Sequence, residues 1–270
     1  MINATKIVWE QLKYFPLIIR MVRYGDQSTY QNFFLGQAWK IINPILQVSV
    51  YFVIFGMGLR NVNQSGNTMQ YAAWLMVGMA VWRFMDEAIM NGSQAIKRQI
   101  GLVTKMKFPL SVLPAIAIAS AIWTFIALFI LGSLFLLFSG SGLNAKWPWL
   151  LYYFFCSVIF SYSFALFNST IIILIPDYIS ILRLFMSLGM WIAGVIFKID
   201  NLNNVIGDIL RLSPFYYIVY GIRDVWVSPD ILFESQFRIC SIIFWSLVLI
   251  FLITGSYLHL KFKKNFMEYI

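Results

Sequence analysis

The stretch Leu110–Phe138, LSVLPAIAIASAIWTFIALFILGSLFLLF, runs without one charged side chain. About 20 apolar residues in a helix cross the hydrocarbon core of a bilayer. Lipid offers no hydrogen bonds to an open backbone, whereas an α-helix satisfies its own. We therefore predict that this stretch is a transmembrane helix.

The rest of the composition agrees with a membrane protein. The chain is 60% hydrophobic, with 25 Phe, 14 Tyr and 10 Trp in 270 residues and a mean hydropathy of +0.77. A soluble domain of this size could not bury so much apolar surface. The net charge is +9. In a membrane protein, cations in the loops mainly reflect which side of the membrane each loop occupies, so we expect no nucleic-acid partner.

Six apolar runs are long enough to cross a membrane, which predicts an all-α polytopic fold with its membrane core over residues 41–258. The runs are Ile41–Leu59, Tyr71–Met90, Leu110–Phe138, Trp149–Ile175, Tyr178–Phe197 and Phe237–Leu258. Cys156 and Cys240 fall inside such runs, which favours buried small side chains over a disulfide or a metal site.

An amphipathic helix is predicted before the first run, within residues 1–40. Over Lys6–Arg23, apolar residues such as Val8, Leu12 and Phe15 recur at helical spacing, and charged residues take the other face. This pattern is typical of a helix that lies in the membrane interface. Glu10 interrupts any apolar core that a cleaved signal peptide would need, so we expect the segment to be retained.

Lysine and arginine mark the cytoplasmic side of a membrane protein. They concentrate in three segments: Lys6, Lys13, Arg20, Arg23 and Lys40; Lys97, Arg98, Lys105 and Lys107; and Lys261, Lys263 and Lys264 in the tail 259–270. Opposite them, the loops after the first and third runs offer Arg60 and Lys146. An even number of spans places both termini in the cytoplasm, in agreement with this bias.

The stretch KRQIGLVTKMKFP, Lys97–Pro109, carries four cations and no acid. We expect Ser93 to cap a short helix over 93–108. Its apolar face would hold Ile96, Ile100 and Val103, and its polar face Lys97, Arg98 and Lys105. The pattern fits a loop lying against anionic headgroups and also a docking surface for a cytoplasmic partner.

Enzymatic motifs are missing from the sequence. No G-x-x-x-x-G-K-[ST] phosphate loop occurs, so this chain is not expected to bind ATP as P-loop proteins do. No Ser/His/Asp set or metal-spaced cluster can be built, and His259, the one histidine, is expected to be an interface anchor. These features disfavour an enzyme and predict no catalytic residue and no metal site.

Four stretches resemble the membrane subunits of type-2 ABC exporters for teichoic acid and lipid-linked polysaccharide, and look closest to the teichoic acid branch. They are FLGQAWKIINPILQVSVYFVIFGMGLR (Phe34–Arg60), YAAWLMVGMAVWRFMDEAI (Tyr71–Ile89), VTKMKFPLSVLP (Val103–Pro114) and SPFYYIVYGIRDVW (Ser213–Trp226). The resemblance implies a single permease domain, 1–270, in a bacterial plasma membrane. It also implies two copies working with two separate ATPase subunits, which use ATP and Mg, and a lipid-linked anionic polysaccharide as cargo.

The resemblance also implies sites. The segment from Lys97 to Lys107 would be a coupling helix that docks on an ATPase subunit. The apolar segment around Ser213-Pro214 suggests two short helices that dip into the membrane, and the family places a re-entrant outer gate here, over residues 198–236. The gate residues are Pro214, Tyr216, Tyr217 and Arg223. At the outer boundary, we expect Arg223 to meet polymer phosphates or to pair with Asp208 or Asp224. The alternative is that Arg223 anchors the short helix in the headgroup layer.

Other assignments stay open between function and packing. Asn43-Pro44 is expected to open the first span, and the aromatic candidates for the translocation path are Tyr51, Phe55, Phe185 and Trp191. Arg83, Asp86 and Glu87 share one helical side where relatives carry aromatic or amide residues, and intramembrane charge flags function or a structural pairing. Relatives carry Arg-Asp where this chain has Pro176-Asp177, and Asp177 is expected to cap the fifth span.

Two rival functions remain at this point. An exporter of drugs or small lipids would share the fold but not a route lined for sugars. A membrane-embedded glycosyl- or acyltransferase would need a catalytic carboxylate or histidine that faces a cavity.

Overall fold

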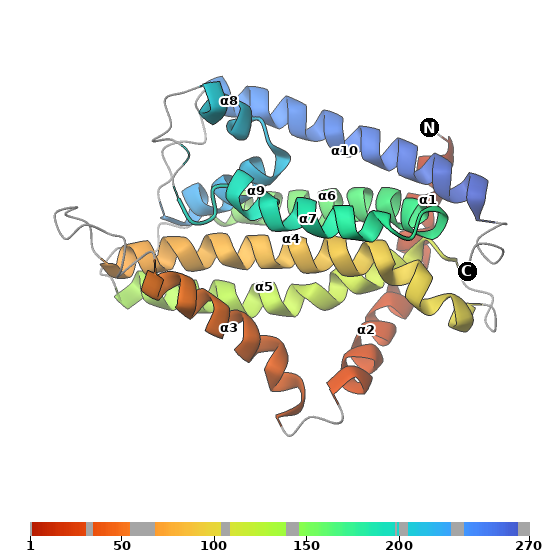
Figure 1. The fold of residues 1–270 in the computed structure, drawn as a ribbon, viewed down its shortest axis with the longest axis horizontal. Coiled ribbons are helices and arrows are strands. Elements are labelled where there is room, and N and C mark those ends of the chain that lie inside the picture. Colours follow the sequence, from red (N-terminus) through yellow and green to blue (C-terminus); the bar gives the residue numbers. More distant parts are fainter. Residues whose placement is uncertain are drawn as a thin grey trace.

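The computed structural model describes residues 2–30, 35–54, 68–103, 109–138, 146–197, 199, 205–227 and 235–263. Within these ranges the regular elements are helical, with no strand, as predicted (Figure 1). The helices are α1 Ile2–Lys13, α2 Phe15–Tyr30, η1 Gly36–Ala38, α3 Trp39–Tyr51, α4 Thr68–Val103, α5 Val112–Phe138, α6 Trp147–Leu174, α7 Tyr178–Ile192, α8 Val205–Arg211, α9 Pro214–Val227 and α10 Ser235–Phe262.

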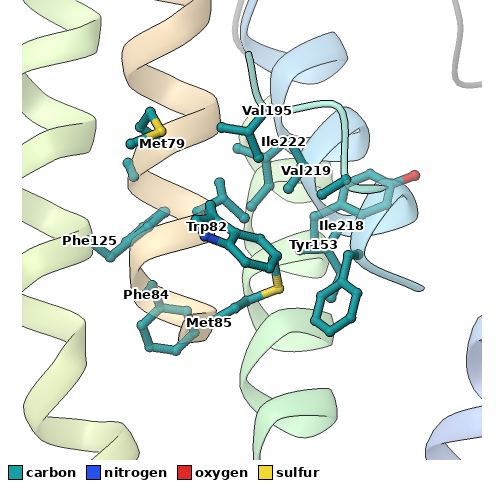
Figure 2. Close-up of a cluster of buried hydrophobic side chains, with 14 of the residues drawn as sticks. Met79, Trp82, Phe84, Met85, Phe125, Tyr153, Val195, Ile218, Val219 and Ile222 are labelled. Carbon is teal, nitrogen blue, oxygen red and sulfur yellow. The ribbon is translucent and has the colours of Figure 1, made fainter. Parts of the chain in front are cut away.

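Helix α4 forms the centre of the bundle. Every residue from Ala72 to Trp82 is buried, so this part of the helix is covered on all sides. It packs mainly against α5 and α6, and also against α9. In Figure 2 the side chains of Trp82 and Met85 from α4 lie between those of α5, α6 and α9. Cys156 and Cys240 are buried free thiols, as predicted.

Length and composition identify three described helices that could cross a membrane: Val112–Phe138, Trp147–Leu174 and Arg238–Phe262. The bent pair of α8 and α9 would make a fourth if it is one span, and α3 and α7 are apolar but short. Each of the six predicted runs contains a helix, but the count of six spans remains a prediction. The end of the first run, residues 55–59, lies outside the described residues.

Three details of the helix ends differ from expectation. Helix α3 begins at Trp39, so Pro44 lies inside the helix instead of opening it. Ser93 is fully buried within α4, which continues without a break to Val103, so no separate coupling helix starts there. Asp177 precedes α7, but its side chain makes no capping hydrogen bond. The first part of the predicted coupling segment is therefore the end of the central helix.

The N-terminal amphipathic segment is two helices, not one. The chain turns at Tyr14, two residues before Pro16. A proline ring clashes with the carbonyl four residues earlier and disfavours the helical conformation of the residue before it, so α1 does not run on through Pro16. Leu12 and Phe15 are exposed apolar side chains on either side of this turn. Exposed apolar side chains of this kind are what helices in the membrane interface present to lipid. The interfacial position of the two helices stays a prediction.

Helices α8 and α9 are joined at the predicted place. Pro214 is the first residue of α9, and the two helix axes differ by 79°. Proline suits this first position because its missing N–H has no partner to lose there. Helix α9 then packs against α6, α4 and α10. The bend matches the expected helix pair, and its re-entrant position in a membrane stays a prediction.

Candidate functional site

A polar cavity of about 310 Å³ lies between α3, α4 and α5. Its walls are Trp39, Asn43 and Pro44 from α3, Arg83, Asp86, Glu87, Met90 and Asn91 from α4, and Thr124 from α5. All three members of the predicted charge cluster thus face one space. The spacing of three and four residues along α4 explains why they share this side.

The charges in the cavity are loosely paired. Arg83 Nη1 lies 3.7 Å from Asp86 Oδ2, and each of the two side chains is 30% exposed. The Thr124 hydroxyl donates a 2.9 Å hydrogen bond to Glu87 Oε2. Arg83 Nε is buried and has no hydrogen-bond partner in the described part of the chain. The polar side chains that line the cavity suit it to hold water or a polar ligand.

The described part of the coupling segment joins the core to an exposed basic surface. Ile96 is fully buried in a second apolar cluster, together with Ile18 and Leu110. Lys97 and Arg98 are exposed. Arg98 donates hydrogen bonds to Gln94 Oε1 at 2.9 Å and to Asn91 Oδ1 at 3.3 Å.

Docking of an ATPase subunit on this surface stays a prediction. Ile100 and Val103 lie in α4, although their side chains are not among those described. Lys105 and Lys107 lie outside the described residues.

A polar clasp fastens α1 to the start of α5. The Ser111 hydroxyl donates a short hydrogen bond to Glu10 Oε2. Gln11 Nε2 donates to the Ser111 carbonyl at 3.1 Å and to the Tyr162 hydroxyl at 2.8 Å. The Tyr162 hydroxyl in turn donates to the same Ser111 carbonyl at 3.1 Å. The clasp connects the N-terminal helix to the residue where the chain leaves the coupling segment.

The tyrosines predicted for the outer gate are buried in the bundle. Tyr217 is 2% exposed, donates to Ser241 Oγ at 3.2 Å and lies 3.2 Å from the Tyr152 hydroxyl. Tyr216 is 6% exposed and stacks on Tyr220 with 4.1 Å between ring centroids. The Tyr217 contacts join α9 to α6 and α10, whereas the stack of Tyr216 on Tyr220 lies within α9. Both rings are buried in this conformation.

Arg223 is placed differently from the expectation. It is only 1% exposed, and its guanidinium carbon lies 3.5 Å from the centroid of the Trp74 ring. Nε donates to the Trp74 carbonyl at 3.1 Å, Nη1 to the Gly194 carbonyl at 2.9 Å, and Nη2 to the Val195 carbonyl. In this conformation the guanidinium is enclosed, so the predicted contact with polymer phosphates is not available to it.

Two of the three carbonyls that hold Arg223 come from the turn that ends α7. Gly194 adopts a φ of +62°, which glycine takes without steric cost. Its N–H donates to the Trp191 carbonyl at 3.0 Å, and the Val195 N–H donates to the Met190 carbonyl at 3.3 Å. These two bonds form the Schellman pattern at a helix C-terminus, where a cation is also favoured.

The aromatic candidates for the path do not form one described wall. Helix α3, with Tyr51, and helix α7, with Phe185 and Trp191, lie on different sides of α4 (Figure 1). Phe185 is 42% exposed and packs on Phe164 and Phe215, whereas Trp191 is 44% exposed. Phe55 lies outside the described residues. A role in a path formed with a second copy stays a prediction.

The comparisons with known proteins give one family. A model described as ABC-2 type transporter matches residues 16–227. An O-antigen export system permease protein of Myxococcus xanthus is 28% identical over 121 residues, which is 45% of each chain. Two O-antigen export system permease proteins of Klebsiella pneumoniae are each 20% identical, one over 94% of this chain and 95% of its own length, the other over 82% and 83%.

Proposed function

Because the chain belongs to the ABC-2 type transporter family, we propose that it is the membrane-spanning permease subunit of an ATP-driven exporter of a lipid-linked polysaccharide. The observation that carries this proposal is the alignment with an O-antigen export permease over 94% of the chain. Teichoic acid is the narrower cargo that the sequence motifs suggested, and the relatives in the comparisons favour polysaccharide in the broader sense.

The assembly that we propose contains two copies of this chain and two separately encoded ATPase subunits. The sequence has no phosphate loop, so the ATPase subunits would bind ATP and Mg. The exposed cations Lys97 and Arg98 would meet the ATPase, with both termini of the permease on the same cytoplasmic side of the plasma membrane.

Helix α4 provides a continuous mechanical connection in this proposal. Its last turns carry the docking residues, its middle lines the polar cavity, and Trp74 near its start holds Arg223 of α9. A displacement of the coupling end would therefore reach both the cavity and the α9 contact through one rigid element. The clasp at Ser111 would make α1 follow the same movement.

Deletion of this gene in its own bacterium tests the proposed function. We expect lipid-linked polysaccharide to accumulate inside the cell and the surface polymer to be lost, with recovery when the chain is supplied on a plasmid. Normal surface polymer in the deletion strain, together with a new sensitivity to drugs or altered lipid transport, would instead favour a small-molecule exporter of the same fold.

A further inference from the structure

The side chains of the cavity between α3, α4 and α5 define which ligand chemistry it can accept. Its described lining residues include one guanidinium, from Arg83, and two carboxylates, from Asp86 and Glu87. A phosphate or another anion would meet both carboxylates at close range, which is unfavourable in a partly desolvated site. A bare cation would meet Arg83, which lies 3.7 Å from Asp86. The described residues contain no group of three or more His, Cys, Asp or Glu that could hold a metal ion.

A neutral ligand with many hydroxyl groups fits these walls better than either ion. Each hydroxyl can donate to a carboxylate and accept from a guanidinium or an amide. The cavity offers Asp86 and Glu87 as acceptors, Arg83 as a donor, and Asn43 as both. Trp39 adds an aromatic surface for the apolar side of a ring.

We propose that this cavity binds a sugar unit of the exported molecule. The volume of about 310 Å³ is near the lower end of small-molecule pockets, about 300–1,000 Å³, which suits a terminal or lipid-proximal sugar and not a long polymer. The cavity also lies close to the coupling end of α4, because Asn91 in its wall accepts a hydrogen bond from Arg98. A bound sugar would thus contact the element that carries the ATPase-docking surface.

The proposal rests on export of a lipid-linked polysaccharide, but a binding experiment tests it separately. The purified full-length permease in lipid nanodiscs is titrated with two probes and followed by native mass spectrometry. One probe is a polyprenyl diphosphate that carries a single N-acetylglucosamine, and the other is the same polyprenyl diphosphate without the sugar. Only the sugar differs, so phosphate and lipid-tail binding cancel in the comparison.

We expect the wild-type chain to bind the sugar-bearing probe about tenfold more tightly, as a few hydrogen bonds to charged groups allow. The double variant Asp86→Asn with Glu87→Gln should lose most of this preference. Asn43→Ala changes an exposed residue and should weaken the preference without affecting folding. The matched control is Asp208→Asn, because Asp208 forms the same i,i+3 pair with an arginine, Arg211, on α8 and outside the cavity.

Two results would overturn the proposal. Equal binding of both probes by the wild-type chain would mean that only the phosphates or the lipid are recognised. An unchanged preference in both the double variant and Asn43→Ala would place the sugar elsewhere. The gene deletion reports on export independently of the binding experiment. If deletion stops polysaccharide export but the purified permease shows no preference for the sugar-bearing probe, only the sugar site is wrong. If the preference is found but deletion leaves export normal, the proposed function is wrong.

Discussion

Gly78 leaves the space that the guanidinium of Arg223 occupies. A Cβ built on Gly78 would stand 1.8 Å from Arg223 Nη2 and 2.2 Å from its Cζ. The two residues belong to α4 and α9, and the same guanidinium donates to the Trp74 carbonyl of α4 and to two carbonyls of the turn after α7. Gly78 therefore allows one buried cation to fasten three elements that are far apart in the sequence.

Gly78→Ala should destabilise the permease. The new methyl group must displace a buried guanidinium that is held by three carbonyls, and overpacking of this kind costs about 1–3 kcal/mol. The measurement is the temperature at which the detergent-purified protein loses its monodisperse peak. The control is Gly25→Ala, because a Cβ at Gly25 meets nothing within 4 Å and alanine favours the helix. Equal melting of both variants would contradict the close contact.

Arg223→Lys should also lower stability, even though the charge is kept. Lysine lacks the planar fork that reaches the Trp74 and Gly194 carbonyls together and stacks on the Trp74 ring. We expect a loss of about 2 kcal/mol or more, typical of a broken buried hydrogen-bond network. The exposed substitution Arg20→Lys is the control. If Arg223→Lys melts with the wild type but fails in export, Arg223 acts on the cargo and not as a structural tie.

Gln11→Ala should loosen the N-terminal helix. It removes the donor to the Ser111 carbonyl and the Tyr162 hydroxyl, each an ordinary hydrogen bond of about 1 kcal/mol. Hydrogen exchange of the α1 amides should become several-fold faster, while the amides of α5 and α6 stay protected. Lys6→Ala, on the exposed side of the same helix, should leave exchange unchanged. Unchanged exchange in Gln11→Ala would mean that apolar packing of Ile7, which is fully buried, holds α1 alone.

Charge reversal at Lys97 and Arg98 to Glu should weaken assembly with the ATPase and reduce export, while the permease still inserts. Exposed charges at the rim of an interface guide association, and like charges repel. The amount of ATPase that co-purifies with the permease measures this effect. Reversal of Lys261 and Lys263 on the tail is the control, because it makes the same change of charge on the same predicted side. Normal co-purification in both would leave the loop as a topogenic signal only.

The sequence predicted the local features of this fold well. Long apolar runs such as Leu110–Phe138 determine helices through composition alone, and Ser213-Pro214 determines a break because proline favours the first turn of a new helix. The shared side of Arg83, Asp86 and Glu87 follows from helical spacing.

What sequence reasoning missed depends on contacts between distant segments. Arg223 was expected to contact polymer phosphates or an aspartate, and nothing local shows that the Trp74 carbonyl, 149 residues away, will accept a hydrogen bond from it. Thr124 is one of three hydroxyl residues in the apolar helix α5, and only packing of α5 on α4 brings it to Glu87. The glycine at position 78 was the one available signal, since a glycine inside a buried helix often marks a close approach.

The proposed function requires that this chain exports a lipid-linked polysaccharide only together with a separate ATPase. The direct test is reconstitution of the purified permease and the ATPase encoded beside it into proteoliposomes, with a fluorescent lipid-linked oligosaccharide on the ATPase side. We predict ATP-dependent movement of the fluorescent headgroup to the opposite leaflet with both proteins, and neither movement nor ATP hydrolysis with the permease alone. ATP hydrolysis by the permease alone, or no headgroup movement by the complete assembly while it hydrolyses ATP, would contradict the proposed function.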